Sequence, residues 1–169
     1  MSRTSAGLLL YRRTADGLQV LLGHPGGPLW AKRDEGAWTL PKGELDGDED
    51  PLAAARREFA EEIGTTLEDD RTYLPLGTVK QSGGKVVHAW AVECDLDADA
   101  VHSNLFTMEW PPRSGRVRQY PEVDRAQWFS LAEAGRKILP GQAPFLERLE
   151  RTLESGGGRD ESRRSAPGE

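Results

Sequence analysis

The sequence is poor in cysteine, histidine and long apolar runs, and each shortage excludes a class of protein. Among 169 residues there is one cysteine, Cys94, so the chain cannot form an internal disulfide. The three histidines are too few and too scattered to indicate a metal cluster built on imidazole. No apolar stretch reaches the roughly 20 residues that a membrane-spanning helix needs, so we expect no membrane partner.

Positive charge is also in short supply. The 22 lysines and arginines are outnumbered by 28 acidic residues, which leaves a formal net charge of −6. General affinity for nucleic acid requires a basic surface, so we expect no nucleic-acid partner. An acidic protein that acts on phosphates must supply positive charge locally, through a metal ion and a few basic side chains. The apolar run near the N-terminus is too short for a signal peptide, which favours a cytoplasmic protein.

What the sequence does contain is the pattern of one α+β domain. A chain of 169 residues that is 37% hydrophobic and 30% charged suits a soluble globular domain, which we place at residues 1–154. Residues 155–169 lack apolar anchors and are predicted to be disordered. Residues 24–37 and 116–121 are predicted to be irregular. Strands are expected at residues 6–12, 18–23, 73–81, 86–96, 104–110 and 125–129.

The most informative segment is an acidic loop followed by a helix. Asp50 suits the N-cap of that helix and Pro51 its first position. Glu58, Glu61 and Glu62 stand at i, i+3 and i+4, so they share one helix face. Three crowded carboxylates repel one another, and a hard divalent cation removes this penalty because it prefers oxygen ligands. The spacing therefore indicates a metal-dependent enzyme.

Two other interpretations of the acidic segment have to be weighed against a metal site. A generic helix with several glutamates usually presents them to solvent as a hydrated face. The alternation of Asp46, Asp48 and Asp50 also suggests an EF-hand calcium loop. That loop requires glycine at its sixth position and glutamate at its twelfth, where this chain has Pro51 and Arg57. The EF-hand interpretation is therefore excluded.

The spacing of the segment resembles the Nudix box, a motif with fixed glycine, arginine and glutamate positions. Thr65 stands where the motif usually has an apolar residue. Residues 38–44 resemble the lead-in to this box, and residues 121–129 resemble a late strand of the same family. The resemblance implies a Nudix-type α/β/α sandwich with a mixed β-sheet. The matching positions are Gly43, Glu49, Arg57, Glu58, Phe59, Glu61, Glu62 and Gly64.

The resemblance also implies a metal site and the residues that form it. Mg²⁺, with Mn²⁺ as an alternative, would be held by Glu58, Glu61, Glu62 and the backbone carbonyl of Gly43. Arg57 would pair with the glutamates and orient them, which is a supporting catalytic role.

A glutamate general base is implied as well, and the family varies in which one serves. Glu58 is one candidate, and a glutamate from a later loop is the other. For the later residue we choose Glu122 first and Glu109 second. Glu61 completes the set of predicted catalytic residues.

Several residues outside the box are candidates for binding a phosphorylated substrate. Lys42 lies beside the predicted site, and Arg113 and Arg116 lie on a loop between Glu109 and Glu122. Each is equally well explained as a solvated surface cation. We expect one aromatic residue of a group of three to stack on a base, the alternative for each being simple packing. The three are Trp30, Trp110 and Tyr120.

The favoured function is a Mg²⁺-dependent pyrophosphohydrolase acting on a nucleoside diphosphate linked to another group. The resemblance of the lead-in favours a nucleoside triphosphate or dinucleoside polyphosphate, and the enzyme would act on this small molecule as a monomer or homodimer. Diphosphoinositol phosphate and ADP-ribose hydrolases remain alternatives. From another class, a Nudix-like domain can bind a nucleotide and regulate a partner without hydrolysis. Such domains often lose the box glutamates, whereas this chain keeps all of them.

Overall fold

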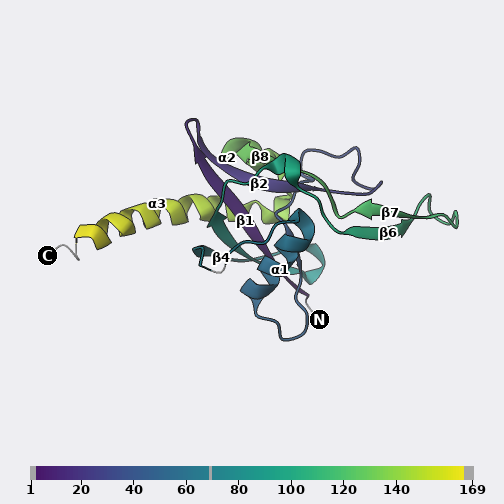
Figure 1. The fold of residues 1–169 in the computed structure, drawn as a ribbon, viewed down its shortest axis with the longest axis horizontal. Helices are drawn as coiled ribbons and strands as arrows, with labels where there is room; N and C mark the ends of the chain where they lie inside the picture. Colours follow the sequence, from purple (N-terminus) through teal and green to yellow (C-terminus); the bar gives the residue numbers. More distant parts are fainter. Residues whose placement is uncertain (1–2, 69, 166–169) are drawn as a thin grey trace.

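The computed structural model describes residues 3–68 and 70–165 and shows three α-helices, eight β-strands and three short 3₁₀ turns within them (Figure 1). In chain order the elements are β1 (Thr4–Thr14), β2 (Gly17–Pro25), β3 (Lys42–Glu44), α1 (Pro51–Ile63), β4 (Tyr73–Lys80), η1 (Ser82–Gly84), β5 (Val86–Glu93), η2 (Ala98–Ala100), β6 (Leu105–Glu109), β7 (Val117–Pro121), β8 (Val123–Ser130), α2 (Leu131–Lys137), η3 (Pro140–Gln142) and α3 (Pro144–Ser165).

The main sheet is mixed, with strand order β4-β5-β1-β2-β8, and β3 pairs with the start of β1. The β1–β5 pair is parallel, and the other pairs are antiparallel. A two-residue turn, Ala15–Asp16, joins β1 to β2 in a hairpin, with Thr14 opposite Gly17. The two N-terminal strands are thus brought to the middle of the sheet, where both of their faces can be covered.

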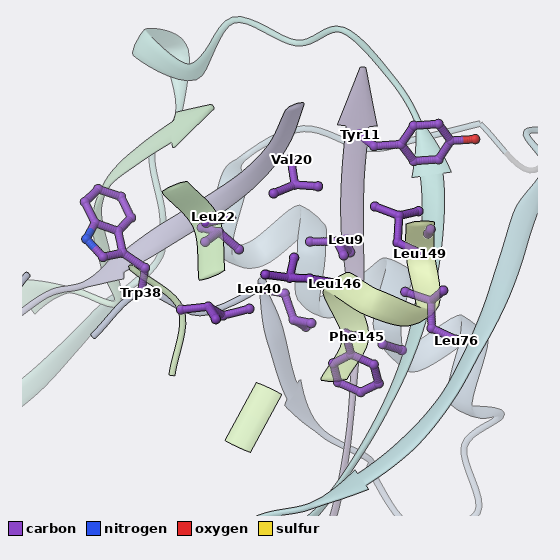
Figure 2. Packing of buried hydrophobic residues seen from close by; sticks show 14 of the residues in the cluster. Leu9, Tyr11, Val20, Leu22, Trp38, Leu40, Leu76, Phe145, Leu146 and Leu149 are labelled. Atoms are coloured by element: carbon purple, nitrogen blue, oxygen red, sulfur yellow. The ribbon is translucent and has the colours of Figure 1, made fainter. Parts of the chain in front are cut away.

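Alternation along β1 divides the core into two halves, because successive side chains point to opposite faces. Leu8 and Leu10 pack with Phe59 and Ile63 of α1 on one face. Leu9 belongs to a second cluster on the other face, which α3 covers (Figure 2). The sandwich of helix, mixed sheet and helix expected from the sequence is therefore confirmed. The members of the second cluster labelled in Figure 2 are Leu9, Tyr11, Val20, Leu22, Trp38, Leu40, Leu76, Phe145, Leu146 and Leu149.

The boundaries of α1 match those expected from the sequence. The Asp50 carboxylate accepts a hydrogen bond from the Ala53 N–H at 3.0 Å, and Pro51 occupies the first turn. Gly64 ends the helix in the left-handed region with φ of 87°. The buried stripe centred on Phe59 fixes the rotation of the helix, so its glutamates face away from the sheet's interior toward β3.

The sequence predicts an irregular segment at residues 116–121, and this prediction is wrong. Residues Val117–Pro121 form β7, which pairs with β6 in a separate two-stranded antiparallel sheet. Its mixed polar composition hides the strand, because most of its side chains are exposed and no apolar alternation is required. Figure 1 shows this hairpin extending beyond the rest of the molecule.

The C-terminal helix α3 covers Pro144–Ser165 and enters the segment 155–169, for which the sequence predicts disorder. Residues 166–169 lie outside the described residues. The domain boundary at residue 154 and the disorder beyond it stay predictions. None of the helices in the described ranges combines the length and apolar character needed to cross a bilayer.

Candidate active site

The site forms where β3 passes beneath the glutamate face of α1. Lys42–Glu44 pairs with the start of β1, which holds Gly43 opposite Ala6. A side chain at position 43 would overlap the Glu58 carboxyl group, so only glycine allows this approach. The glycine of the motif is therefore needed for close contact between backbone and carboxylate rather than for an unusual φ angle.

Arg57 organises the acidic residues around this contact. Its guanidinium makes a two-pronged ion pair with Glu49, with both N–O distances 2.9 Å. It also contacts Glu58 at 2.8 Å and Glu61 at 3.5 Å. The hydrogen bonds from Arg57 lower the pKa of Glu49 to about 2, so Glu49 stays ionised and anchors the arginine. Arg57 is thus placed where it can orient the glutamates, and its supporting role in catalysis stays a prediction.

A cavity of about 300 Å³ opens beside the glutamate face. Larger hollows, of about 530 and 440 Å³, lie elsewhere on the surface and contain none of the motif's residues. The cavity beside the glutamates is lined by residues of the box, of the lead-in to the box, of the long loop after β2 and of the root of the β6–β7 hairpin. Its lining residues are Pro25, Trp30, Thr39, Leu40, Lys42, Glu62, Gln81, Lys85, Glu122, Val123 and Leu139.

Three neighbouring carboxyl groups have raised pKa values; Glu62 and Glu122 line the cavity, and Glu58 does not. Burial, with a contribution from Glu122, raises the pKa of Glu62 to about 8. Burial is also the main cause of the raised pKa values of Glu58 and Glu122, and in each a nearby Glu61 adds to it. Burial lowers the pKa of the Lys42 ammonium against the opposing attraction of Glu62. The carboxylates of the site therefore repel one another in a poorly hydrated environment, and a bound cation would relieve this repulsion.

The donor set at the site fits a hard divalent cation. Among the described side chains, those of residues 3–68 and 70–155, no three acidic, histidine or cysteine groups are already gathered around one point. The Glu58 carboxylate contacts Arg57, and a Glu62 oxygen accepts the Lys42 N–H at 3.3 Å. The mutual repulsion of Glu58, Glu62 and Glu122, and the open approach at Gly43, are nevertheless what an oxygen-liganded cation requires. On metal binding, contacts between these carboxylates and the cation would replace the contacts that they now make with Arg57 and Lys42.

A buried histidine holds the long loop of residues 26–37 against the sheet. His24 is 1% exposed, and its Nε2 donates to the Arg33 carbonyl oxygen at 2.7 Å. Its Nδ1 lies 2.9 Å from the Asp124 carboxylate on β8. Trp38 packs edge-on against the same ring, with centroids 5.1 Å apart. These contacts place Trp30, which lines the cavity, and explain why the loop is ordered although it has no regular structure.

The structure separates the predicted substrate-binding residues into two groups. Lys42 and Trp30 line the cavity, as does the predicted base Glu122. Trp110, Arg113, Arg116 and Tyr120 belong to the β6–β7 hairpin and do not line it.

Sequence reasoning missed Gln81, Lys85 and His24 as parts of the site. Gln81 and Lys85 flank the short turn between β4 and β5, and the Gln81 N–H donates to the Lys85 carbonyl at 2.7 Å. A polar pair around two glycines carries no local signal of function, since only the sheet order brings this turn to the cavity. The roles of all these residues in binding and catalysis stay predictions.

Comparison with known proteins relates this geometry to a family. The chain matches the family model described as the NUDIX domain over residues 1–149. It is 30% identical over 128 residues to an RNA pyrophosphohydrolase of Acidiphilium cryptum (strain JF-5), a match that covers 68% of this chain and 70% of that protein.

Two solved structures extend the comparison. The binary complex of a C. elegans Ap4A hydrolase superposes with a TM-score of 0.63 at 25% identity, over 89% of this chain and 98% of the other. The NUDIX domain of Shewanella oneidensis NrtR, crystallised with ADP ribose, superposes with a TM-score of 0.63 over 90% of this chain and 89% of the other. At 18% identity this second likeness supports the fold alone.

Proposed function

Because the chain belongs to the NUDIX family and is a hydrolase, we propose that it is a Mg²⁺-dependent pyrophosphohydrolase of nucleotides. The observation that carries this proposal is that Glu62 and Glu122, both with raised pKa values, line one cavity with Lys42, and that the neighbouring Glu58, whose pKa is also raised, repels both. The substrate is a nucleoside diphosphate linked to another group. Nucleoside triphosphates and dinucleoside polyphosphates fit this description, and so does the triphosphorylated 5′ end of an RNA.

Glu58, Glu61, Glu62 and the Gly43 carbonyl would hold Mg²⁺, with Mn²⁺ as a substitute. When bound, the metal neutralises charge on the phosphates and lowers the pKa of its water. Arg57 keeps Glu58 oriented toward Gly43 through the ion pair at 2.8 Å. Lys42 and Lys85 also line the cavity, and their ammonium groups would bind the phosphates.

We assign the general base to Glu122. It lines the cavity, and burial raises its pKa toward the working range of a base at neutral pH. Glu58 is held by Arg57 and suits the metal instead. We do not assign this role to Glu109, whose carboxylate accepts the Gly115 N–H at 2.7 Å within the hairpin tip and which does not line the cavity. Glu122 would take the proton from the attacking water as the phosphoanhydride oxygen leaves.

The nucleoside is placed by Trp30 at the mouth of the cavity. Arg33 lies over the Trp30 ring at 5.4 Å from its centroid, and Trp30 also packs against the core, so a base would contact the part of the ring that lines the cavity. Stacking on tryptophan tolerates any base, so Trp30 contributes affinity more than base selectivity.

The test is hydrolysis of a panel in the presence of Mg²⁺ or a chelator. The panel contains nucleoside triphosphates, dinucleoside polyphosphates, 5′-triphosphorylated RNA, ADP-ribose and a diphosphoinositol phosphate. We expect nucleotide cleavage that is lost on chelation and reduced at least about 100-fold by Glu62→Gln, because a metal ligand is removed. Nucleotide binding without turnover under any metal would favour a regulatory binding module and refute the proposed enzyme.

The Glu122→Gln variant distinguishes the proposed general base from the proposed metal ligands. We expect this variant to bind Mg²⁺ as the parent does, to lose kcat, and to lose the acidic limb of the pH profile of kcat. An acidic limb that stays in Glu122→Gln and disappears in Glu58→Gln would move the base to Glu58.

A further inference from the structure

The β6–β7 hairpin has two faces of different chemistry. In the antiparallel register Phe106 stands opposite Tyr120 and Met108 opposite Arg118, so these four side chains share one face. The Trp110 N–H donates to the Arg116 carbonyl at 2.9 Å, which continues the same pairing toward the tip. We call this the aromatic–basic face, and it consists of Phe106, Met108, Trp110, Arg116, Arg118 and Tyr120.

The opposite face carries no cation. It presents Leu105, Thr107 and Glu109 from β6, with Val117 and Gln119 from β7. Leu105 and Val117 are 56% and 68% exposed. The two faces therefore differ in charge, although they belong to the same short hairpin.

The arginines of the aromatic–basic face have no carboxylate partner. Among the side chains of residues 3–68 and 70–155, no ion pair and no side-chain hydrogen bond involves the guanidinium of Arg116 or Arg118. Most of the other arginines are engaged, as Arg57 is with several carboxylates. In a chain of net charge −6, exposed guanidinium groups without acidic neighbours favour a polyanionic ligand.

The aromatic–basic face is continuous with the active-site cavity. Phe106 and Met108 line a hollow of about 330 Å³ together with Trp30, which also lines the cavity. The Phe106 and Tyr120 rings lie 6.0 Å apart between their centroids. The base candidate Glu122 follows directly on β7, and its N–H donates to the Asn104 carbonyl at the root of β6 at 2.9 Å.

A glycine keeps the hollow next to this face open. A side chain at Gly27 would come within 2.9 Å of the Phe106 ring, and Gly27 has φ of 96°. The loop after β2 can therefore run close to the hairpin without filling the space between them. The hollow thus extends from Trp30 to Phe106 and Met108, and Arg118 stands opposite Met108 in the strand register.

We propose that the aromatic–basic face binds the single-stranded nucleic-acid chain that follows a 5′-phosphorylated nucleotide held in the active site. The inference rests on the proposed function, because it names the group to which the nucleoside diphosphate is linked. The rings of Phe106, Trp110 and Tyr120 offer stacking surfaces for bases, and the guanidinium groups of Arg116 and Arg118 on the same face offer positive charge for the phosphates between them. A strand of five residues spans roughly 17 Å, and a stacked strand rises about 3.4 Å per nucleotide, so the face accommodates several nucleotides.

The proposal does not conflict with the net charge of the chain. Residues 105–121 contain three arginines and one glutamate, so the hairpin has a net charge of +2 while the whole chain has −6. Because the rest of the chain is acidic, it repels duplexes and long polyanions that extend beyond the basic hairpin. It admits a short single strand that enters end-on.

The test compares a double variant, Arg116→Gln with Arg118→Gln, against the parent protein. A control variant, Arg136→Gln with Arg151→Gln, removes the same charge from α2 and α3. Binding is measured by fluorescence anisotropy with a short labelled 5′-monophosphorylated RNA over a range of salt concentrations. We expect Kd for the hairpin variant to rise about tenfold at low salt. The slope of the logarithm of its binding constant against the logarithm of salt concentration should decrease in magnitude by roughly 0.7 for each phosphate that the protein no longer neutralises. The control variant should match the parent.

Turnover supplies a second readout. We expect the ratio of kcat/KM for a 5′-triphosphorylated RNA to kcat/KM for the nucleoside triphosphate to fall about tenfold in the hairpin variant only. An equal decrease for both substrates, or no decrease for either, would overturn the proposal. So would light scattering that shows a parent dimer which the hairpin variant dissociates, because the face would then be an interface between two copies.

The two proposals can fail separately. RNA binding that depends on the hairpin, without hydrolysis of any nucleotide, would refute the enzyme and leave the strand-binding face in place. Metal-dependent hydrolysis of mononucleotides, without RNA binding above that of the hairpin variant, would refute the strand-binding face alone.

Discussion

Replacing Glu62 by glutamine is expected to stabilise the metal-free protein, although it removes a proposed metal ligand. Burial and the nearby Glu122 raise the pKa of Glu62 to about 8, from 4.5 when the group is unperturbed. Between these two pH values the folded state holds a proton that the unfolded chain has released. The carboxyl group therefore lowers the free energy of unfolding as pH rises from about 4.5 to about 8, and the decrease is complete above that range.

The size of the effect follows from the width of this window. Each pH unit in which folded and unfolded states differ by one proton changes the free energy of unfolding by about 1.4 kcal/mol. From pH 5 to pH 7 the parent protein should thus lose about 2 to 3 kcal/mol through this group. Glutamine has no charge to desolvate, and its carbonyl can still accept the Lys42 N–H that now donates to Glu62 at 3.3 Å.

The assay is thermal unfolding in a chelator from pH 5 to pH 9. For a chain of this size about 2 to 4 °C of Tm corresponds to each kcal/mol, so Glu62→Gln should exceed the parent by about 5 to 10 °C at pH 7. The difference should shrink toward pH 5. Glu61→Gln is the matched control, since its carboxylate is 40% exposed and has much less burial to relieve.

Addition of Mg²⁺ should reverse the order. The parent gains Tm because the cation binds the folded state, whereas Glu62→Gln gains little. The reasoning fails if the variant is no more stable than the parent at pH 7 in chelator. It also fails if both proteins lose stability in parallel as pH rises.

Two further substitutions test the geometry around the site. Gly43→Ala should lower kcat/KM at least about 100-fold, because the new methyl group displaces the Glu58 carboxyl group. Small misplacements at a reacting centre have effects of this size. A kcat/KM near the parent value in steady-state kinetics would contradict the close approach. Asp50→Ala should lower Tm by about 2 to 4 °C, because the helix loses the cap to the Ala53 N–H at a cost of about 1 kcal/mol. Asp48→Ala, which removes a neighbouring exposed acid, is its control in the same melting experiment, and equal shifts for both would refute the capping role.

Local sequence signals predicted the elements whose stability is local. The cap at Asp50, the proline at position 51 and the stop at Gly64 follow from short-range rules, and α1 begins and ends where they require. The same holds for the cap of α2, where the Ser130 hydroxyl accepts the Glu133 N–H at 3.2 Å. Such features depend on residues three or four positions apart, so no tertiary information is needed.

Non-local parts of the site could not be predicted in the same way. The strand Val117–Pro121 has the composition of an irregular loop, because an exposed hairpin needs no apolar pattern. His24 carries no motif around it, and its role follows only from the positions of Arg33 and Asp124, the latter a hundred residues away. Lys85 reaches the cavity only because β5 lies beside β1 in the sheet.

The sequence by itself determined the chemistry of this protein. The fixed spacing of Gly43, Arg57, Glu58, Glu61 and Glu62 places an arginine and three carboxylates close together on one helix, which is a local consequence of 3.6 residues per turn. It thereby indicated the family, the fold and a metal-dependent reaction before any contact was known.

The tertiary structure alone decided what surrounds that chemistry. Sheet order brings Glu122 and Lys85 to the cavity, and burial there, rather than any property of the motif, raises the pKa of Glu62 to about 8. Strand register places Phe106 and Arg118 on one face of the hairpin. Burial and register depend on contacts between distant segments, and no spacing along the chain encodes them.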